Sequence, residues 1–183
     1  MTETFPPLTP NGLALTEIIG DIFAAPPNTL LIHACNCLGS WSAGIAAAFK
    51  KNYPAAFLVY EKHCRDSIPE DLIGTALMIP PWEKDDSKPK HYVGCLFTSK
   101  KYGKGRDSPE EILRSTKPAM EQLIKLVGED GGVDGVRMCR INSGLFSVRW
   151  EDSREVLRGI EVEEGVNVAS LTPCQNRPCH KGE

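Results

Sequence analysis

The stretch TLLIHACNCLGSWSAGIA, residues 29–46, decides the fold of this chain. Residues 29–35 form a short apolar run after Pro26 and Pro27, which is typical of a strand buried on both faces of a sheet. Small residues follow it and lead into a helical pattern from residue 43. A buried strand, a turn of small residues and a helix together indicate an α/β protein with a largely parallel sheet.

Apolar runs and helical patterns alternate along the rest of the chain in the same way. A capping box from Ser108 to Glu111 opens a long helix, and Pro118 predicts a kink or a break inside it. We therefore expect a mixed, mostly parallel central sheet in a three-layer α/β/α fold, spanning residues 13–172 between an N-terminal extension (1–12) and a flexible tail (173–183). The expected strands are residues 13–19, 29–35, 73–79, 91–97, 136–141 and 166–171, and the expected helices are 43–51, 54–65, 108–127 and 151–159.

Composition excludes several classes of protein. The chain of 183 residues is 41% hydrophobic, so it can bury a substantial core, and its formal net charge of -3 argues against bulk binding to nucleic acid or anionic membrane. No signal peptide opens the chain, and no apolar run approaches the roughly 18 residues of a membrane span. We expect a soluble cytoplasmic protein, with the nucleus as a second location, that acts as a monomer.

The cysteines and most of the histidines are expected to be structural. Five cysteines lie in or beside apolar stretches and are expected to be buried free thiols: Cys35, Cys37, Cys64, Cys95 and Cys139. Cys174, Cys179 and His180 form one tail cluster, which without a second half does not predict zinc. His63, His91 and His180 are expected on the surface or in structural positions, and no metal or cofactor is expected.

Ligands of open parallel sheets bind beyond the carboxyl ends of the strands, which selects the loops 20–22, 36–46 and 142–148. In loop 36–46 small residues allow close approach of a ligand, and the helix start that follows suits a phosphate. An ordinary tight turn is the alternative. Loop 142–148 is also rich in small polar residues, so the two loops could clamp a diphosphate. Neither matches the P-loop or the G-x-G-x-x-G pattern.

Four segments carry a resemblance to a known family. GDI at residues 20–22, LIHACNCLGSWSAGIA at 31–46, CLFTS at 95–99 and RINSGLFSVRW at 140–150 resemble the macrodomain family of ADP-ribose-binding modules. Within that family the chain is most similar to the fungal ADP-ribose 1''-phosphate phosphatases. The resemblance extends over about residues 13–171, and it implies the macrodomain fold, a small-molecule substrate and a link to tRNA splicing.

The resemblance also implies roles for individual residues. Asp21 would accept a hydrogen bond from the adenine amino group, and Asn36 would bind the hydroxyls of the distal ribose. Phe146 would pack against that ribose, and Trp150 would fill the core. The backbone of residues 41–46 would follow the diphosphate, and the amides of residues 143–148 would cradle the phosphates. The implied substrate-binding set is Gly20, Asp21, Ile22, Ala34, Cys35, Asn36, Trp41, Ser42, Ala43, Gly44, Ile45, Ala46, Asn142, Ser143, Gly144, Leu145, Phe146, Ser147 and Val148.

The family contains hydrolases and pure readers, and two departures bear on the choice. Where some members carry a catalytic aspartate this chain has Phe146 or the pair Ile45-Ala46, which argues against both ways of removing ADP-ribose from proteins. The phosphatase activity remains, with His33 as acid or base and Asn36 orienting the ribose. A core histidine that braces the loop is the alternative role for His33. A non-catalytic ADP-ribose-binding module or an ADP-ribosyl-protein hydrolase is the alternative function.

Ser143 and Cys37 are weaker candidates for a nucleophile, because no obvious base flanks either of them.

Overall fold

The computed structural model describes residues 12–88, 90–162 and 171–174. Its strands form one sheet in the order β2-β3-β1-β4-β5. β2 runs antiparallel to β3, whereas β1 is parallel to β3 and β4, and β4 to β5. The expected mixed, mostly parallel sheet is therefore confirmed. The strands are β1 (Thr29–Asn36), β2 (Ala76–Ile79), β3 (Tyr92–Ser99), β4 (Gly135–Cys139) and β5 (Leu171–Cys174).

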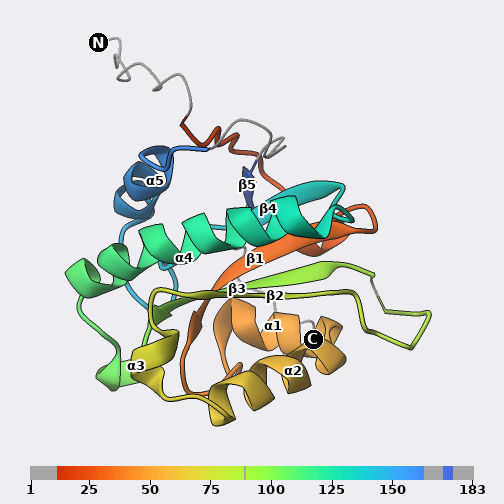
Figure 1. The fold of residues 1–183 in the computed structure, drawn as a ribbon, viewed down its shortest axis with the longest axis horizontal. Coiled ribbons are helices and arrows are strands. Elements are labelled where there is room, and N and C mark those ends of the chain that lie inside the picture. Colours follow the sequence, from red (N-terminus) through yellow and green to blue (C-terminus); the bar gives the residue numbers. More distant parts are fainter. Residues whose placement is uncertain (1–11, 89, 163–170, 175–183) are drawn as a thin grey trace, which may run out of the picture.

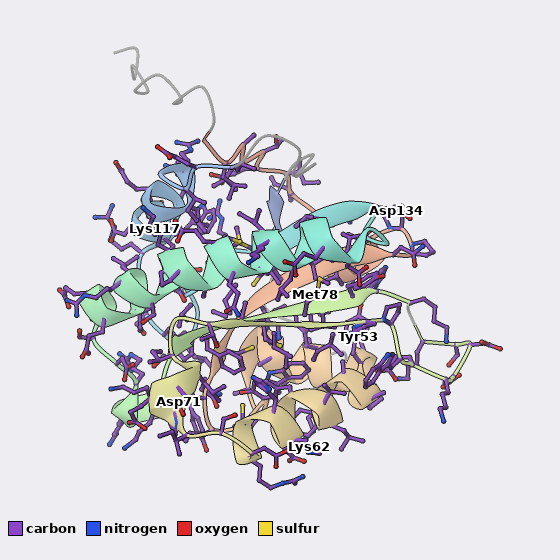
Figure 2. The ribbon with its side chains drawn as sticks, in the orientation of Figure 1. Tyr53, Lys62, Asp71, Met78, Lys117 and Asp134 are labelled. Atoms are coloured by element: carbon purple, nitrogen blue, oxygen red, sulfur yellow. The ribbon has the colours of Figure 1, made fainter. Side chains whose placement is uncertain are left out.

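Helices cover both faces of the sheet. In Figure 1, α1 and α2 lie on one side of the strands, and α4 and α5 on the other, which confirms the three-layer arrangement. Charged side chains such as Lys62 on α2 point away from the sheet (Figure 2). No helix in the described ranges is long and apolar enough to span a membrane. The helices are η1 (Ile22–Ala24), α1 (Gly44–Asn52), α2 (Pro54–Arg65), α3 (Pro69–Leu72), η2 (Gly103–Gly105), α4 (Pro109–Asp130) and α5 (Trp150–Arg158).

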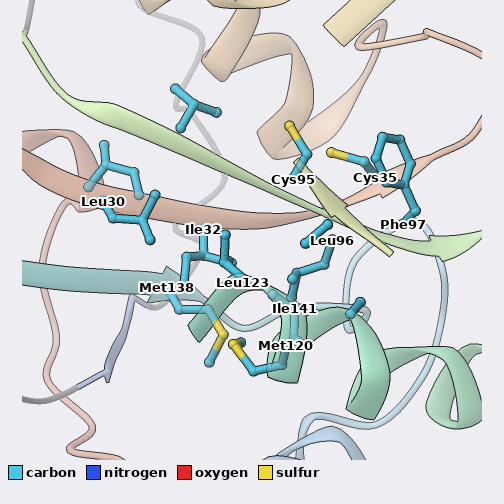
Figure 3. Close-up of a cluster of buried hydrophobic side chains, with 14 of the residues drawn as sticks. Leu30, Ile32, Cys35, Cys95, Leu96, Phe97, Met120, Leu123, Met138 and Ile141 are labelled. Atoms are coloured by element: carbon cyan, nitrogen blue, oxygen red, sulfur yellow. The ribbon is translucent and has the colours of Figure 1, made fainter. Parts of the chain in front are cut away.

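The two faces of β1 support two layers of core. Ile32 packs toward Leu123 of α4, while Cys35 and Cys95 lie on the opposite side of the strands (Figure 3). A side chain at Gly94 would place its Cβ 3.0 Å from Leu123 and 3.1 Å from Ile32, so this strand position needs glycine for α4 to approach. β1 is buried along almost its whole length, as its apolar sequence predicts.

The long helix α4 begins as expected and continues further. The Ser108 side chain accepts a hydrogen bond from the Glu111 amide, and the Glu111 carboxylate accepts one from the Ser108 amide. The expected break near Pro118 is wrong, because α4 is continuous to Asp130. Burial of Thr116, Ala119 and Met120 on either side of the proline offsets the hydrogen bond that Pro118 cannot donate. Gly131, in the left-handed conformation with φ of 69°, ends the helix.

Two of the expected strands need correction. Residues 13–19 form no strand: among the described residues Gly12 makes an isolated bridge with Glu161, and the Leu13 amide donates to Ile160. Leu13 is buried in the core whereas Ile18 and Ile19 are exposed, so burial does not extend along the whole apolar segment. Residues 73–75 turn instead of extending, with Gly74 at φ of 77°, and β2 starts only at Ala76.

The last expected strand, 166–171, lies largely outside the described residues. Strand pairing instead occupies Leu171–Cys174, where β5 pairs with β4. Residues 173 and 174, which we expected to belong to the tail, are part of β5, and Cys179 and His180 lie outside the described residues. The five cysteines that we expected to be buried free thiols are confirmed as such.

Candidate functional site

The carboxyl ends of β1, β3 and β4 lie side by side at one edge of the sheet, because these strands are parallel neighbours. Asn36 ends β1 and pairs with Ser99, which ends β3. The Thr98 hydroxyl of β3 donates a 2.8 Å hydrogen bond to Oδ1 of Asn142, just after β4. The two loops that the sequence selects, 36–46 and 142–148, therefore begin at neighbouring points.

The Asn36 side chain shapes the first loop. Its Oδ1 accepts hydrogen bonds from the amides of Leu38 (2.9 Å) and Ser40 (3.4 Å), and its Nδ2 donates to the Ser40 carbonyl at 2.7 Å. The Tyr60 hydroxyl donates to the Asn36 carbonyl. We expected Asn36 to orient the ribose directly. The structure shows that the carboxamide holds the loop, which gives Asn36 a positioning role, and the contact with the ribose stays a prediction, because only one of the two N–H groups of Nδ2 is bonded within the described residues.

The first loop leads into α1, and the start of this helix has no side-chain cap. Ala43 is the N-cap residue and has no polar side-chain atom, so it satisfies none of the first amides of the helix. The amides of Gly44, Ile45 and Ala46 precede the first helical hydrogen bond, from Ala47 to Ala43. An uncapped helix start carries about half a unit of positive charge, which suits an anion such as phosphate.

Asn142 holds the second loop through a buried network. Its Oδ1 accepts from Thr98, and its Nδ2 donates to Thr116 Oγ1 (3.0 Å) and Ser153 Oγ (3.2 Å). Asn142 also has φ of 62°, a left-handed conformation that asparagine tolerates better than most residues. One side chain therefore ties the loop to β3, α4 and α5.

The second loop leaves three consecutive amides without a hydrogen bond in the described part of the chain, those of Gly144, Leu145 and Phe146. The amides on either side of this run are engaged: before it Ser143 donates to the Arg140 carbonyl, and after it Ser147 donates to the Gly144 carbonyl and Val148 to the Asn142 carbonyl. The expected cradle of amides from residue 143 to 148 is therefore narrower, because Ser143, Ser147 and Val148 use their amides to close the loop. Successive free amides form a concave site for an anion.

The two loops approach each other, and the surface where they meet is called the crevice below. A Cβ added at Gly44 would lie 3.4 Å from Cδ1 of Leu145, and Gly44 has φ of 58°. The start of α1 and the amides 144–146 therefore lie close together. Phe146 packs with Ile112 and Val148 beneath the loop, where Ala34 of β1 also contacts them. The main part of the Phe146 ring is buried, so it fixes the loop from below.

Gly20 and Asp21 lie on the surface, while Ile22 is buried. One carboxylate oxygen of Asp21 accepts a 2.9 Å hydrogen bond from the amide of Phe23, which caps η1. Phe23 in turn packs edge-on against Phe49 of α1. The structure thus places an exposed carboxylate in a braced turn that is packed against α1.

His33 does not line the crevice. Its ring is fully buried, stacks on Phe49 at 4.0 Å between centroids, and meets the edge of Trp41 at 4.8 Å. A ring enclosed by aromatic side chains cannot exchange a proton with a bound substrate, so the expected role of His33 as acid or base is wrong. The alternative, a core histidine that braces the loop, fits its position under Trp41. Trp41 is likewise buried, and the exposed residues of this loop are Leu38, Ser42, Ala43 and Gly44.

The cysteines next to the loop are not nucleophiles in this structure. Burial, followed by the neighbouring Cys64, raises the pKa of Cys37 to about 12, so its thiol stays protonated at neutral pH. Burial also raises the pKa of Cys35. The Ser143 hydroxyl donates to the Arg140 carbonyl at 2.7 Å, which holds the loop. Neither Cys37 nor Ser143 is prepared for attack.

One group of side chains in the described residues has the spacing to hold a metal ion. The ligand atoms of His33, Cys35 and Cys95 all lie within 4.8 Å of one another. All three side chains are buried on the side of β1 that faces α1, away from the exposed amides of the loops.

A charged cluster that the sequence did not predict supports the second loop. The Glu17 carboxylate accepts hydrogen bonds from Arg154 (2.9 Å), Arg140 (3.3 Å) and the Trp150 indole (3.4 Å). Burial alone would raise the pKa of Glu17, but the bonds from Arg154 and Trp150 and the two arginine charges outweigh it and hold the pKa below its usual range. Trp150 is buried, as expected. No pattern around residue 17 signals this contact, because the partners lie more than 120 residues away.

The fold defines a class of protein: a three-layer α/β/α module in which two loops of small residues meet at the carboxyl edge of a mostly parallel sheet. Comparison with known proteins agrees. The family model described as "Macro domain" matches residues 32–157. A protein of Chaetomium globosum named ADP-ribose 1''-phosphate phosphatase is 51% identical over 86% of this chain and 90% of its own length. A protein of the same name from Aspergillus oryzae is 40% identical over 87% and 94%.

Solved structures agree on the fold. The macrodomain of Mycobacterium tuberculosis DarG superposes with a TM-score of 0.63 at 22% identity, covering 91% of this chain and 99% of that one. Thermosipho africanus DarTG in complex with ADP-ribose superposes with a TM-score of 0.69 at 12% identity, over 93% of this chain and 43% of that one. The chain belongs to the macro domain family.

The Asn142 network predicts a large stability loss on truncation. Asn142→Ala leaves the buried Thr98 hydroxyl without its acceptor and puts alanine in a left-handed conformation, so we expect a loss of about 3 kcal/mol in unfolding free energy. Asn28→Ala is the matched control: Asn28 has φ of 60°, but its side chain makes an exposed bond to Asp134. We expect about 1 kcal/mol there. Urea unfolding measures both, and equal losses would show that the network adds nothing.

The Glu17 cluster predicts a pH-dependent contribution to stability. Because folding lowers the pKa of Glu17, its contribution is present above the unfolded value of about 4.3 and disappears as pH falls through the folded value. We expect Glu17→Gln to lower the melting temperature by about 2–4 °C at pH 7. Thermal unfolding of both proteins from pH 7 down to pH 3 should show the difference closing at the acid end. A difference that stays constant would contradict the lowered pKa.

Proposed function

We propose that this protein is an ADP-ribose 1''-phosphate phosphatase, which hydrolyses its substrate to ADP-ribose and inorganic phosphate. The proposal is carried by one observation: Gly44, at the uncapped start of α1, lies next to the Leu145 side chain, in the loop whose amides at residues 144–146 make no hydrogen bond within the described residues. Two sets of N–H donors that face one crevice suit a diphosphate. The relatives named ADP-ribose 1''-phosphate phosphatase support the substrate.

The ligand would lie across the ends of the central strands. Its diphosphate would be held between the start of α1 and the amides 144–146, where N–H groups from both loops converge. The exposed carboxylate oxygen of Asp21 would accept a hydrogen bond from the adenine amino group. The distal ribose would then lie near the ends of β1 and β3, over the loop that Asn36 holds in place.

Hydrolysis would rest on positioning and charge stabilisation. A water oxygen attacks phosphorus, the bond between phosphorus and the 1'' oxygen breaks, and the leaving oxygen takes a proton from solvent. Fixed amide donors stabilise the negative charge that develops on the phosphoryl oxygens, and they need no reorganisation because the loops are already braced by Asn36 and Asn142. No step uses His33, which is buried.

A non-catalytic ADP-ribose-binding module is the second candidate. It is favoured by one observation: His33, the side chain expected to act as acid or base, is fully buried and enclosed by aromatic rings. We also propose that the ligand is a small molecule bound by a monomer in the cytoplasm, without nucleic acid. The net charge of -3 supports the last point.

Release of inorganic phosphate from ADP-ribose 1''-phosphate distinguishes the phosphatase from the non-catalytic binding module. The phosphatase releases phosphate in multiple turnovers, and a variant with the crevice closed does not. If the wild-type protein releases only background phosphate while calorimetry still detects ADP-ribose binding, the binding module is the correct function.

Gly44→Ala tests the crevice itself. The new Cβ would lie at ordinary contact distance, 3.4 Å, from Leu145, but φ of 58° is strained for alanine, so the backbone at the start of α1 is expected to shift. We expect ADP-ribose affinity to fall about tenfold. Gly131→Ala, at φ of 69° with nothing within 4 Å, imposes the same backbone strain at the end of α4 and should leave affinity unchanged. Calorimetry measures the ADP-ribose affinity of both variants. An unchanged affinity in Gly44→Ala would show that the ligand binds elsewhere.

A further inference from the structure

The segment after β3 is strongly basic in a chain whose formal net charge is -3. Residues 100–106, here called the basic segment, carry four positive charges and no acidic residue: Lys100, Lys101, Lys104 and Arg106. Lys101, Lys104 and Arg106 are exposed, and Lys100 is half-buried. None of these four side chains forms an ion pair with a described residue. Unpaired surface charges of one sign attract a ligand of the opposite sign.

The backbone of the basic segment is fixed next to the crevice. The Cys37 amide, directly after Asn36, donates to the Lys100 carbonyl at 3.2 Å. The Ser99 hydroxyl donates to the Lys101 carbonyl at 2.8 Å and accepts from the Asp107 amide. The Asp107 carboxylate accepts from the Lys100 amide. The segment is therefore held at both ends, and its cations stand at a defined place beside the end of β1.

This place corresponds to one end of the proposed ligand. η1, which carries Asp21 at its N-cap, contacts β4 on one side of β1. The basic segment follows β3, on the other side of β1. A ligand with adenine at Asp21 and its diphosphate over the end of β1 would therefore direct its distal ribose toward the basic segment.

The proposed substrate differs from its product only at that end. ADP-ribose 1''-phosphate carries a phosphate monoester on the distal ribose, with a second pKa near 6 and hence close to two negative charges at neutral pH. ADP-ribose has none there. The diphosphate is shared by both molecules, so the contact of the loop amides with the diphosphate does not distinguish substrate from product.

We infer that the basic segment binds the terminal phosphate of the substrate and makes the protein prefer ADP-ribose 1''-phosphate over ADP-ribose. The inference rests on the proposed function. Lys101 and Lys104 are the exposed lysines of the segment and supply the charge; Arg106 has an additional bond to the Gly103 carbonyl that holds the turn. Loss of the phosphate on hydrolysis removes this attraction, which favours release of the product.

The test compares two double variants that remove the same charge. Lys101→Gln/Lys104→Gln neutralises the basic segment. Lys117→Gln/Lys125→Gln neutralises two exposed lysines on α4, each in a weak pair with a glutamate one turn along the helix. For the first variant we expect KM for ADP-ribose 1''-phosphate to rise about tenfold and its dependence on salt to weaken. Its affinity for ADP-ribose, measured by calorimetry, should stay within about twofold of wild type, and the α4 variant should match wild type in both.

An unchanged KM in the Lys101→Gln/Lys104→Gln variant overturns the inference, and so does an equal loss of affinity for ADP-ribose. Failure of the proposed function looks different, because the wild-type protein would then release no phosphate. In that case calorimetry with both ligands still decides: a wild-type preference for ADP-ribose 1''-phosphate that disappears in the variant supports the inference, and no preference overturns it.

Discussion

Two buried asparagines at the ends of neighbouring strands impose the constraint on which the crevice depends. Asn36 follows the buried run of β1 and bonds to the amides and carbonyl of its own loop, while Asn142 follows β4 and bonds to side chains from β3, α4 and α5. Each carboxamide satisfies groups that the turn would otherwise leave unpaired. The loops are therefore fixed before any ligand arrives, and the amides of Gly144, Leu145 and Phe146 keep no hydrogen bond within the described residues.

Side chains and backbone therefore have different roles in this site. Side chains hold the loops from below: His33 and Trp41 pack under the first, and Phe146, Ile112 and Val148 pack under the second. Backbone N–H groups of residues 44–46 and 144–146 are left to meet phosphate. Recognition by fixed amides needs no charged residue in the crevice, which explains how a chain with net charge -3 can be suited to an anionic ligand. Positive charge is added only at one end, by the basic segment.

Much of the fold could be predicted because its signals are local. The apolar run of β1, the proline that starts α2 and the capping box of α4 each depend on residues within a few positions. The predictions that failed depend on tertiary contacts. Residues 13–19 have an apolar pattern but no strand partner among the described residues at Ile18 and Ile19. α4 continues through Pro118 because packing on the sheet offsets the lost bond.

The site, too, was predicted only where its signals are local. Glycines and small residues predict where the loops are, but burial decides which side chains are available. His33 and Asn36 have suitable chemistry for catalysis, and only the packing of Phe49 and the bonds to Ser40 reveal their structural roles.

The central claim is that the ligand is held by backbone amides and that the asparagine side chains only support them. Nitrogen-proton correlation spectra of the labelled protein, recorded as ADP-ribose is added, test this directly. The account predicts large shifts of the backbone amides of residues 44–46 and 144–146, with the side-chain amide signals of Asn36 and Asn142 almost unmoved. Large shifts of those two side-chain signals, with the six backbone amides unchanged, would contradict it.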